Sequence, residues 1–247
     1  MELIAKNPFD TDNNARYYYD SKSDGQIGRN PELRSEFSEF VLQKGYPCVG
    51  AQAAVNGNTF AIGDFGFMEN GATPRNLAYG LSEYLFAMSG DPGSFLTYIA
   101  IFPESKFSGE KGFEKAMWNL LARLNAEDAK YFDWPQKYSS DPSKEDFSFS
   151  FGGEGFFIVG LHPASSRKAR RFKYPAIAFN LQVQFDSLRQ KGRFDVMRDS
   201  IREREMAFQD SVNPMLADFG KGAQAPQYSG RMVGAEWQCP FLAKNKI

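Results

Sequence analysis

The sequence predicts a single α+β domain in which helices flank a mixed, mainly antiparallel sheet. Two observations carry this prediction: helix-spaced and strand-like apolar segments are mixed along the chain, and they follow no repeated strand–helix–strand order. The length of 247 residues is also enough to bury a large core. We expect a polar, turn-rich leader over residues 1–28 and the single domain over residues 29–247.

Four segments carry apolar residues at helical spacing, and each is predicted to form a helix. The first begins at Asn30 and Pro31, which suit an N-cap followed by a proline in the first turn. Its apolar residues share one helix face, and Gly45 ends it. The other three helices are expected over residues 73–88, 113–124 and 194–208.

The strands are predicted from apolar runs that are bounded by turn residues. Residues 95–102 are continuously apolar, which indicates a central strand that is buried on both faces. Residues 147–151 alternate Phe with Ser, and a Gly-rich turn at 152–155 leads into a second apolar run. Further strands are expected over residues 49–55 and 58–65, joined in a hairpin by Asn-Gly, and from residue 176 onward.

Charge and cysteine content limit the partners and the compartment. The formal net charge is −1, so the whole molecule does not attract nucleic acid or an anionic membrane. No apolar run reaches the ~18 residues of a membrane span. Cys48 and Cys239 are too few for a disulfide framework, and the N-terminal residues lack the pattern of a secretory signal. We therefore expect a cytoplasmic protein without nucleic-acid or membrane partners.

The composition leaves room for a flat apolar ligand. Hydrophobic residues make up 42% of the chain, and 24 residues are Phe. So many rings indicate either an aromatic core or a pocket around a large, flat molecule. Common catalytic motifs are missing, since the chain has no G-x-S-x-G, H-E-x-x-H, C-x-x-C or P-loop. One histidine and two distant cysteines also make a structural zinc site an unfavourable interpretation.

His162 is the only histidine in the chain. It ends the second Phe-rich run, precedes Pro163, and is followed closely by Arg167, Arg170 and Arg171. One interpretation is a partly buried imidazole that hydrogen-bonds near a helix start. The other is an axial ligand of haem iron, because a rigid imidazole beside guanidinium groups suits both the iron and the haem propionates.

The three arginines are predicted to form a local anion site. Arg167, Arg170 and Arg171 have the spacing that places side chains on one side of a helix, and Ser166 lies beside them. Such a cluster would hold haem propionates, a substrate carboxylate or a phosphate group. The alternative is a basic face exposed to solvent.

Three more residues are candidates for the site. Cys48 is either a small buried residue at a strand start or a thiolate ligand of haem iron. Asp91 and Glu154 are carboxylates on Gly-rich turns, and either could bind a guanidine or amine by a bidentate contact. Glu154 is preferred because it is closer in sequence to His162.

Several of these segments together resemble the signature of the YqcI/YcgG family. The resemblance rests on Tyr46-Pro47-Cys48, the Gly90-Asp91-Pro92 turn, Trp134-Pro135 and, above all, the sequence FSFGGEGFFIVGLHPASSRKARRF over residues 149–172. These segments keep the family's order and rough spacing over residues 30–242. Characterised members of this family are haem-dependent N-oxygenases that act on guanidine-containing amino acids.

The resemblance implies haem b with His162 as the axial ligand, dioxygen as a co-substrate and an external electron donor. The expected reaction is hydroxylation of a nitrogen in an arginine-like guanidine or a related amine. Glu154 or Asp91 would orient that group. Two alternatives remain open: a haem-binding sensor or carrier without turnover, and a haem-free module that binds an anion. A homodimer is expected by analogy with other small haem enzymes.

Overall fold

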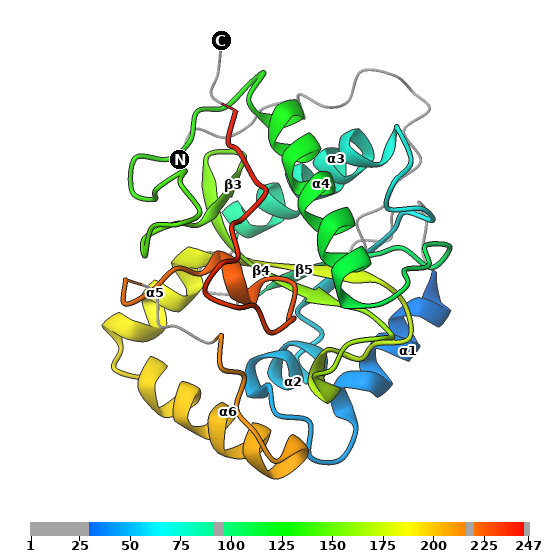
Figure 1. Cartoon of the computed structure of the whole chain (residues 1–247), viewed down its shortest axis with the longest axis vertical. Coiled ribbons are helices and arrows are strands. Elements are labelled where there is room, and N and C mark those ends of the chain that lie inside the picture. The colour runs from blue at the N-terminus through cyan, green and yellow to red at the C-terminus, as the bar shows by residue number, and fades with distance from the viewer. Residues whose placement is uncertain (1–29, 91–95, 216–219, 245–247) are drawn as a thin grey trace.

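A five-stranded sheet forms the centre of the protein (Figure 1). The computed structural model describes residues 30–90, 96–215 and 220–244. The sheet has the order β1-β2-β5-β4-β3, and only β1 and β2 of these strands are parallel. The strands are β1 (Phe60–Asp64), β2 (Thr97–Ile101), β3 (Phe149–Phe151), β4 (Glu154–Leu161) and β5 (Ala176–Leu181). The predicted α+β class with a mostly antiparallel sheet is confirmed. The predicted leader lies outside the described residues.

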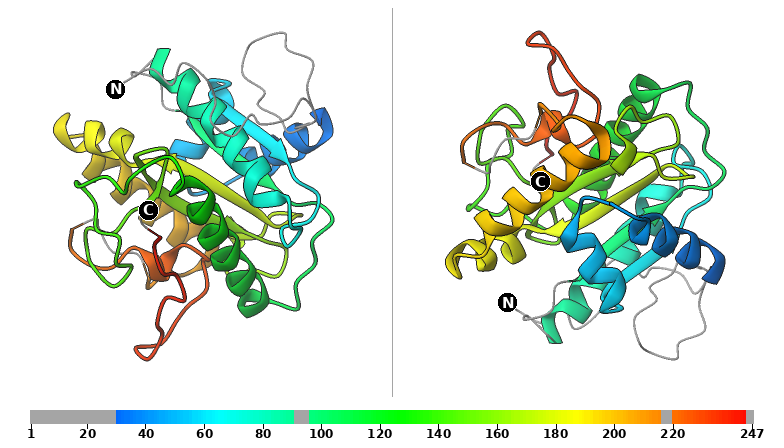
Figure 2. Two further views of the ribbon diagram at one scale, coloured as in Figure 1. Left: turned by 90° about the horizontal axis from the view of Figure 1, so that it is seen from above. Right: turned by 90° about the horizontal axis from the view of Figure 1, so that it is seen from below.

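Helices cover both faces of the sheet (Figures 1 and 2). On one face lie α3 (Thr73–Gly90) and α4 (Glu110–Asp128), which pack against each other. The opposite face is covered by α1 (Pro31–Leu42), α2 (Val49–Asn56) and α6 (Phe194–Gln209). A short helix, α5 (Gln182–Gln190), follows directly from β5 and was not expected from the sequence.

Much of the aromatic content is used in the core between the sheet and the helices α3 and α4. The three Phe residues that alternate with Ser before the Gly-rich turn are all fully buried, and so is Phe241 near the C-terminus. Phe241 contacts the rings of Phe147, Phe149 and Trp134 at centroid distances of about 6 Å. An aromatic core of this kind was one of the two interpretations of the composition.

The hairpin predicted around Asn56 and Gly57 is wrong. Residues 49–56 form α2, and Gly57 ends it by donating its N–H to the carbonyl of Ala53 at 2.8 Å. Alanine favours a helix, and Asn-Gly ends helices as readily as it turns hairpins. β1 therefore has no hairpin partner in this segment and pairs in parallel with β2.

None of the described helices is both long and apolar enough to cross a bilayer.

Candidate functional site

A cavity of about 260 Å³ lies between the sheet and the helices α2 and α6. Its floor is one face of β2, β5 and β4, including Ile99, Ala178 and Val159. Ala51 of α2 and Ile201 of α6 are among the side chains on the opposite side. Most lining residues are apolar or aromatic, as is usual for the binding sites of small organic molecules.

Cys48 lines this cavity at the N-terminus of α2. Its Sγ accepts the backbone N–H of Ala51 at 3.4 Å, so the side chain caps the helix and is fixed in direction. Burial raises the pKa of the thiol, while the N–H groups of Ala51 and Gly50 and the charge of Arg170 act to lower it. The site therefore supplies donors and a positive charge that would stabilise the thiolate form once a metal replaces the proton.

Arg170 supplies that positive charge. Its side chain donates to the carbonyls of Gly160 at 3.1 Å, Tyr228 at 3.3 Å and Gln227 at 3.4 Å. Burial lowers the pKa of Arg170, yet a guanidinium keeps its proton in proteins. Arg170 therefore joins the end of β4 to the C-terminal segment and places a fixed charge at the cavity.

Arg167 and Glu205 form a buried ion pair that also lines the cavity. Arg167 donates in addition to Ser211, at 2.7 Å to the carbonyl and 3.0 Å to the hydroxyl. The second oxygen of Glu205 accepts the N–H of Asn213 at 3.4 Å. The Nε atom of Arg167 is buried and has no hydrogen-bond partner among the described residues, so one of its donors remains unused.

The predicted arginine cluster is therefore only partly assembled. Only residues 168–170 form a helical turn, a 3₁₀ turn, so the three arginines do not share a helix face and that prediction was wrong. Arg171 donates its Nε to the carbonyl of Ser165 at 2.9 Å and does not line the cavity. Ser166 is exposed and hydrogen-bonds to Glu110 through its N–H and its hydroxyl.

His162 lies on the opposite face of the sheet from the cavity. Its imidazole is 1% exposed and stacks on Phe113 of α4 at 4.5 Å between ring centroids. Leu161 lines the cavity, and successive side chains of an extended chain point to opposite faces. Burial lowers the pKa of His162 to about 4; the carboxylate of Glu110 opposes this effect, and Arg170 adds to it. The Nε2 atom is buried without a hydrogen-bond partner among the described residues.

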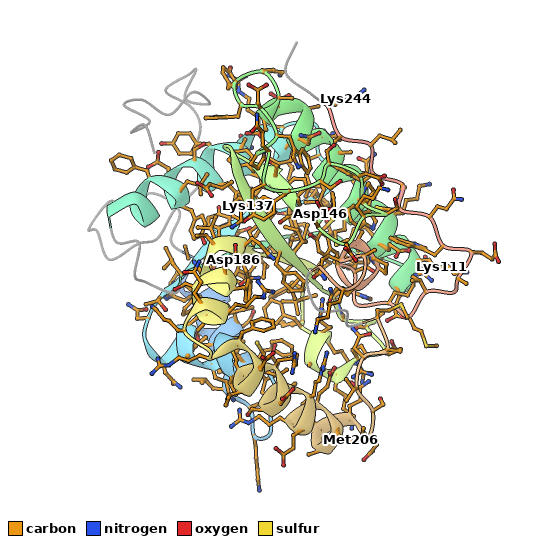
Figure 3. The ribbon with its side chains drawn as sticks, turned by 90° about the vertical axis from the view of Figure 1, so that its left-hand side faces the viewer. Lys111, Lys137, Asp146, Asp186, Met206 and Lys244 are labelled. Atoms are coloured by element: carbon orange, nitrogen blue, oxygen red, sulfur yellow. The ribbon has the colours of Figure 1, made fainter. Side chains whose placement is uncertain are left out.

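Of the two predicted catalytic carboxylates, the structure describes only Glu154, and Glu154 does not line the cavity. It begins β4, at the end of the strand away from Arg170. Burial raises its pKa, and Lys137 acts to lower it. Lys137 itself forms an ion pair with Asp186 of α5 (Figure 3). Asp91 lies outside the described residues.

Four polar residues at the cavity were missed by sequence reasoning. They are Thr97 of β2, Asn180 of β5, Glu205 of α6 and Asn213. Asn180 had a recognisable signal, because an amide is unusual inside the apolar strand AIAFNL. Glu205 had none, since it is one of several charged residues in its helix.

Among the described residues, no group of three or more His, Cys, Asp or Glu side chains could hold a metal ion. A haem iron needs only one or two protein ligands, so this finding does not bear on haem.

Comparison with known proteins identifies the family. The model of the YqcI/YcgG family matches residues 37–242. The chain is 30% identical over 212 residues to the uncharacterized protein YqcI of Bacillus subtilis (strain 168), a match that covers 82% of each chain. It is 28% identical over 182 residues to the uncharacterized protein YcgG of the same strain, covering 71% of each. No solved structure matches. The chain belongs to the YqcI/YcgG family.

Proposed function

We propose that the protein is a haem-dependent N-oxygenase that hydroxylates a nitrogen of a guanidine or a related amine. The observation that carries this proposal is Cys48, a fixed sulfur that faces an apolar cavity and lies near the charge of Arg170. The reaction takes up dioxygen, two electrons from an external donor and two protons. It yields the N-hydroxy product and one water molecule.

The residues at the cavity match a haem in the chemistry of their donors, and a cavity of about 260 Å³ would have to widen to admit the whole macrocycle. A thiolate is an established axial ligand of haem iron, and the walls of the cavity are mostly apolar. Arg167 and Arg170 place two guanidinium groups at the cavity, and these would attract a carboxylate of the haem or of the substrate. A haem held by these residues would supply the activation of dioxygen.

The chain's own groups prepare this site. Cys48 must lose its proton to bind iron, and the Ala51 N–H then remains as a donor to the negative sulfur. The nearby Glu205 disfavours the thiolate, and its ion pair with Arg167 limits that effect. The apolar floor excludes water from the reacting groups. Because Cys48 has to stay reduced, we place the protein in the cytoplasm.

His162, the ligand that the resemblance implies, remains the alternative. Its Nε2 atom has no hydrogen-bond partner in the part of the chain that the structure describes, and its low pKa keeps the ring neutral, as ligation requires. However, the ring is fully buried against Phe113, and the cavity lies on the other face of the sheet. The geometry therefore favours Cys48.

The proposal is tested on protein purified after expression with a haem precursor. We expect a Soret band, together with consumption of dioxygen that requires both a reductant and L-arginine or a related guanidine. A Soret band without this consumption at any guanidine or amine indicates a sensor or carrier. A colourless protein that binds phosphate indicates the anion-binding module, and either result contradicts the N-oxygenase. Sedimentation of the same sample tests the expected homodimer.

A further inference from the structure

Helix α6 covers one side of the cavity from the periphery of the fold (Figure 1). Met197, Ile201 and Glu205 line the cavity and are spaced four residues apart, so they form one stripe along the helix. The structure describes every residue of α6, and of these only Glu205 is buried. In α4, by contrast, ten residues are buried. Burial therefore holds α6 in place far less firmly than it holds α4.

The C-terminal end of α6 is fastened by polar contacts to the segment that follows β4. Arg167 forms its buried ion pair with Glu205 and also donates to the Ser211 carbonyl at 2.7 Å. Gln209 accepts the backbone N–H of Lys168 at 2.5 Å. These contacts of Arg167 and Lys168 with residues 205–211 are called the α6 latch below. The latch lies at the wall of the cavity, because Arg167 and Glu205 both line it.

The N-terminal end of α6 has the properties of a hinge. α5 follows directly from β5, and Gly192 lies between α5 and α6. Its φ of +64° is one that glycine adopts without strain, and apart from its chain neighbours no atom lies within 4 Å of where a Cβ would be. α6 has 16 residues, which corresponds to a length of about 24 Å. A small rotation at Gly192 therefore moves the latch end by several ångströms.

Contacts on the rim of the cavity also hold α6, and they are easier to separate than the ion pair. Arg204 donates to Gln52 of α2 at 2.8 Å in an exposed position, where water can replace the contact. Phe208 contacts Tyr46 edge to face, with ring centroids 6.5 Å apart. The ion pair is buried, so separating it leaves two charges that need new partners. Release of the latch is therefore the costly step in any movement of α6.

We propose that α6 is a lid over the cavity, with its hinge at Gly192 and the α6 latch as its fastening. A cavity of about 260 Å³ is smaller than the usual range of ligand pockets, about 300–1,000 Å³. Opening of the lid supplies the widening that a larger ligand requires, and closure then shields that ligand from water. The inference goes beyond the proposed function, because it applies to any ligand larger than the closed cavity.

Labelling of Cys48 with thiol reagents of two sizes tests the lid without turnover. Cys48 lines the cavity, so a bulky reagent reaches it only when the lid opens. The reagents are methyl methanethiosulfonate, which is small, and fluorescein maleimide, which is bulky. The full chain is used in a preparation without a Soret band, and peptide mass spectrometry locates each label. Cys239 does not line the cavity, so its labelling is the internal control.

The ratio of the bulky to the small labelling rate measures access to Cys48. Burial raises the pKa of the Cys48 thiol, and the charge of Glu205 adds to this effect. Removing that charge therefore speeds the reaction with both reagents, since both attack the thiolate. The ratio cancels this change, and it rises only where the bulky reagent gains access.

Two latch variants and one control variant are compared with the wild type. Glu205→Gln removes the charge of the ion pair and should raise the ratio about tenfold or more. Gln209→Ala removes an exposed part of the latch, should raise the ratio about threefold, and carries the test if Glu205→Gln does not fold. Arg198→Ala changes the same helix outside the latch and should leave the ratio unchanged. Equal ratios in the wild type and the latch variants would overturn the lid.

Hydrogen exchange of the backbone amides is a second readout, which works with or without a group bound at Cys48. Glu205→Gln should speed exchange throughout α6 about tenfold or more and leave α4 unchanged. A protein without haem or turnover that shows both results refutes the oxygenase and supports the lid. An active haem oxygenase whose latch variants keep wild-type labelling ratios and wild-type exchange in α6 refutes the lid and leaves the oxygenase intact.

Discussion

Replacing His162 with leucine should remove a large loss of stability that the wild-type protein undergoes in acid. The imidazole is fully buried against Phe113, and burial lowers its pKa from 6.5 to about 4. Leucine has a similar size, so His162→Leu keeps most of the packing and deletes the titrating group. It also deletes the Nε2 atom, for which the described residues provide no hydrogen-bond partner.

The magnitude follows from the difference between the folded and unfolded pKa of His162. Below pH 6.5 the unfolded chain takes up a proton that the folded protein refuses until about pH 4. The unfolded state therefore binds more protons in this window, and the free energy of unfolding falls as the pH falls. The span from 6.5 to about 4 corresponds to about 3 kcal/mol.

Urea unfolding at pH 7, 5.5 and 4 measures this effect. The free energy of unfolding of His162→Leu, relative to the wild type, should rise by about 3 kcal/mol from pH 7 to pH 4. With a slope near 3 kcal/mol per molar urea, the relative midpoint moves by about 1 M. Phe113→Leu is the control, because it removes the stacked ring and leaves the imidazole. Parallel pH profiles for wild type and His162→Leu would refute the reasoning.

Two further predictions concern buried carboxylates that belong to helix α4. Asp128 accepts the N–H of Gly152 at 2.8 Å, and burial raises its pKa from 3.8 to about 7. The folded protein therefore holds this proton longer, and stability falls as the pH rises from 3.8 to 7. Asp128→Asn should remove that fall, so the difference in urea midpoint between the variant and the wild type should be more positive at pH 8 than at pH 4; an unchanged pH profile would contradict it. Arg231 contacts the buried Glu114 at 3.0 and 2.5 Å. Arg231→Ala should cost about 3 kcal/mol in thermal or urea unfolding, because it leaves a buried carboxylate without its cation. The control is Arg198, whose partners Asp195 and Asp199 are both exposed, and Arg198→Ala should cost at most about 1 kcal/mol.

Local sequence patterns that are compatible with only one structure predicted much of the fold. The apolar face of α1, its Asn30 cap and the Gly-rich turn between β3 and β4 each have one good structural solution. Asn56-Gly57 has two, a hairpin turn and a helix end, and the alanines before it decided for the helix. The choice between such structures depends on residues outside the short motif, which the motif itself does not specify.

The candidate site was predictable only in part, for a similar reason. Cys48 and the arginine-rich segment were recognised, but the cavity also needs Asn180 and Glu205 from distant elements. His162 and Leu161 are adjacent, and a strand sends neighbouring side chains to opposite faces. The cavity lies on the face of the sheet against which α2 and α6 pack. The residues around His162 do not indicate which face that is.

The most direct test of the central claim is the spectrum of the reduced protein with carbon monoxide, recorded for Cys48→Ser and His162→Leu. A thiolate ligand shifts the Soret band of this adduct to a longer wavelength than an imidazole ligand does. We predict the long-wavelength band in the wild type and in His162→Leu, and its loss in Cys48→Ser. A band that persists in Cys48→Ser and disappears in His162→Leu would contradict the account.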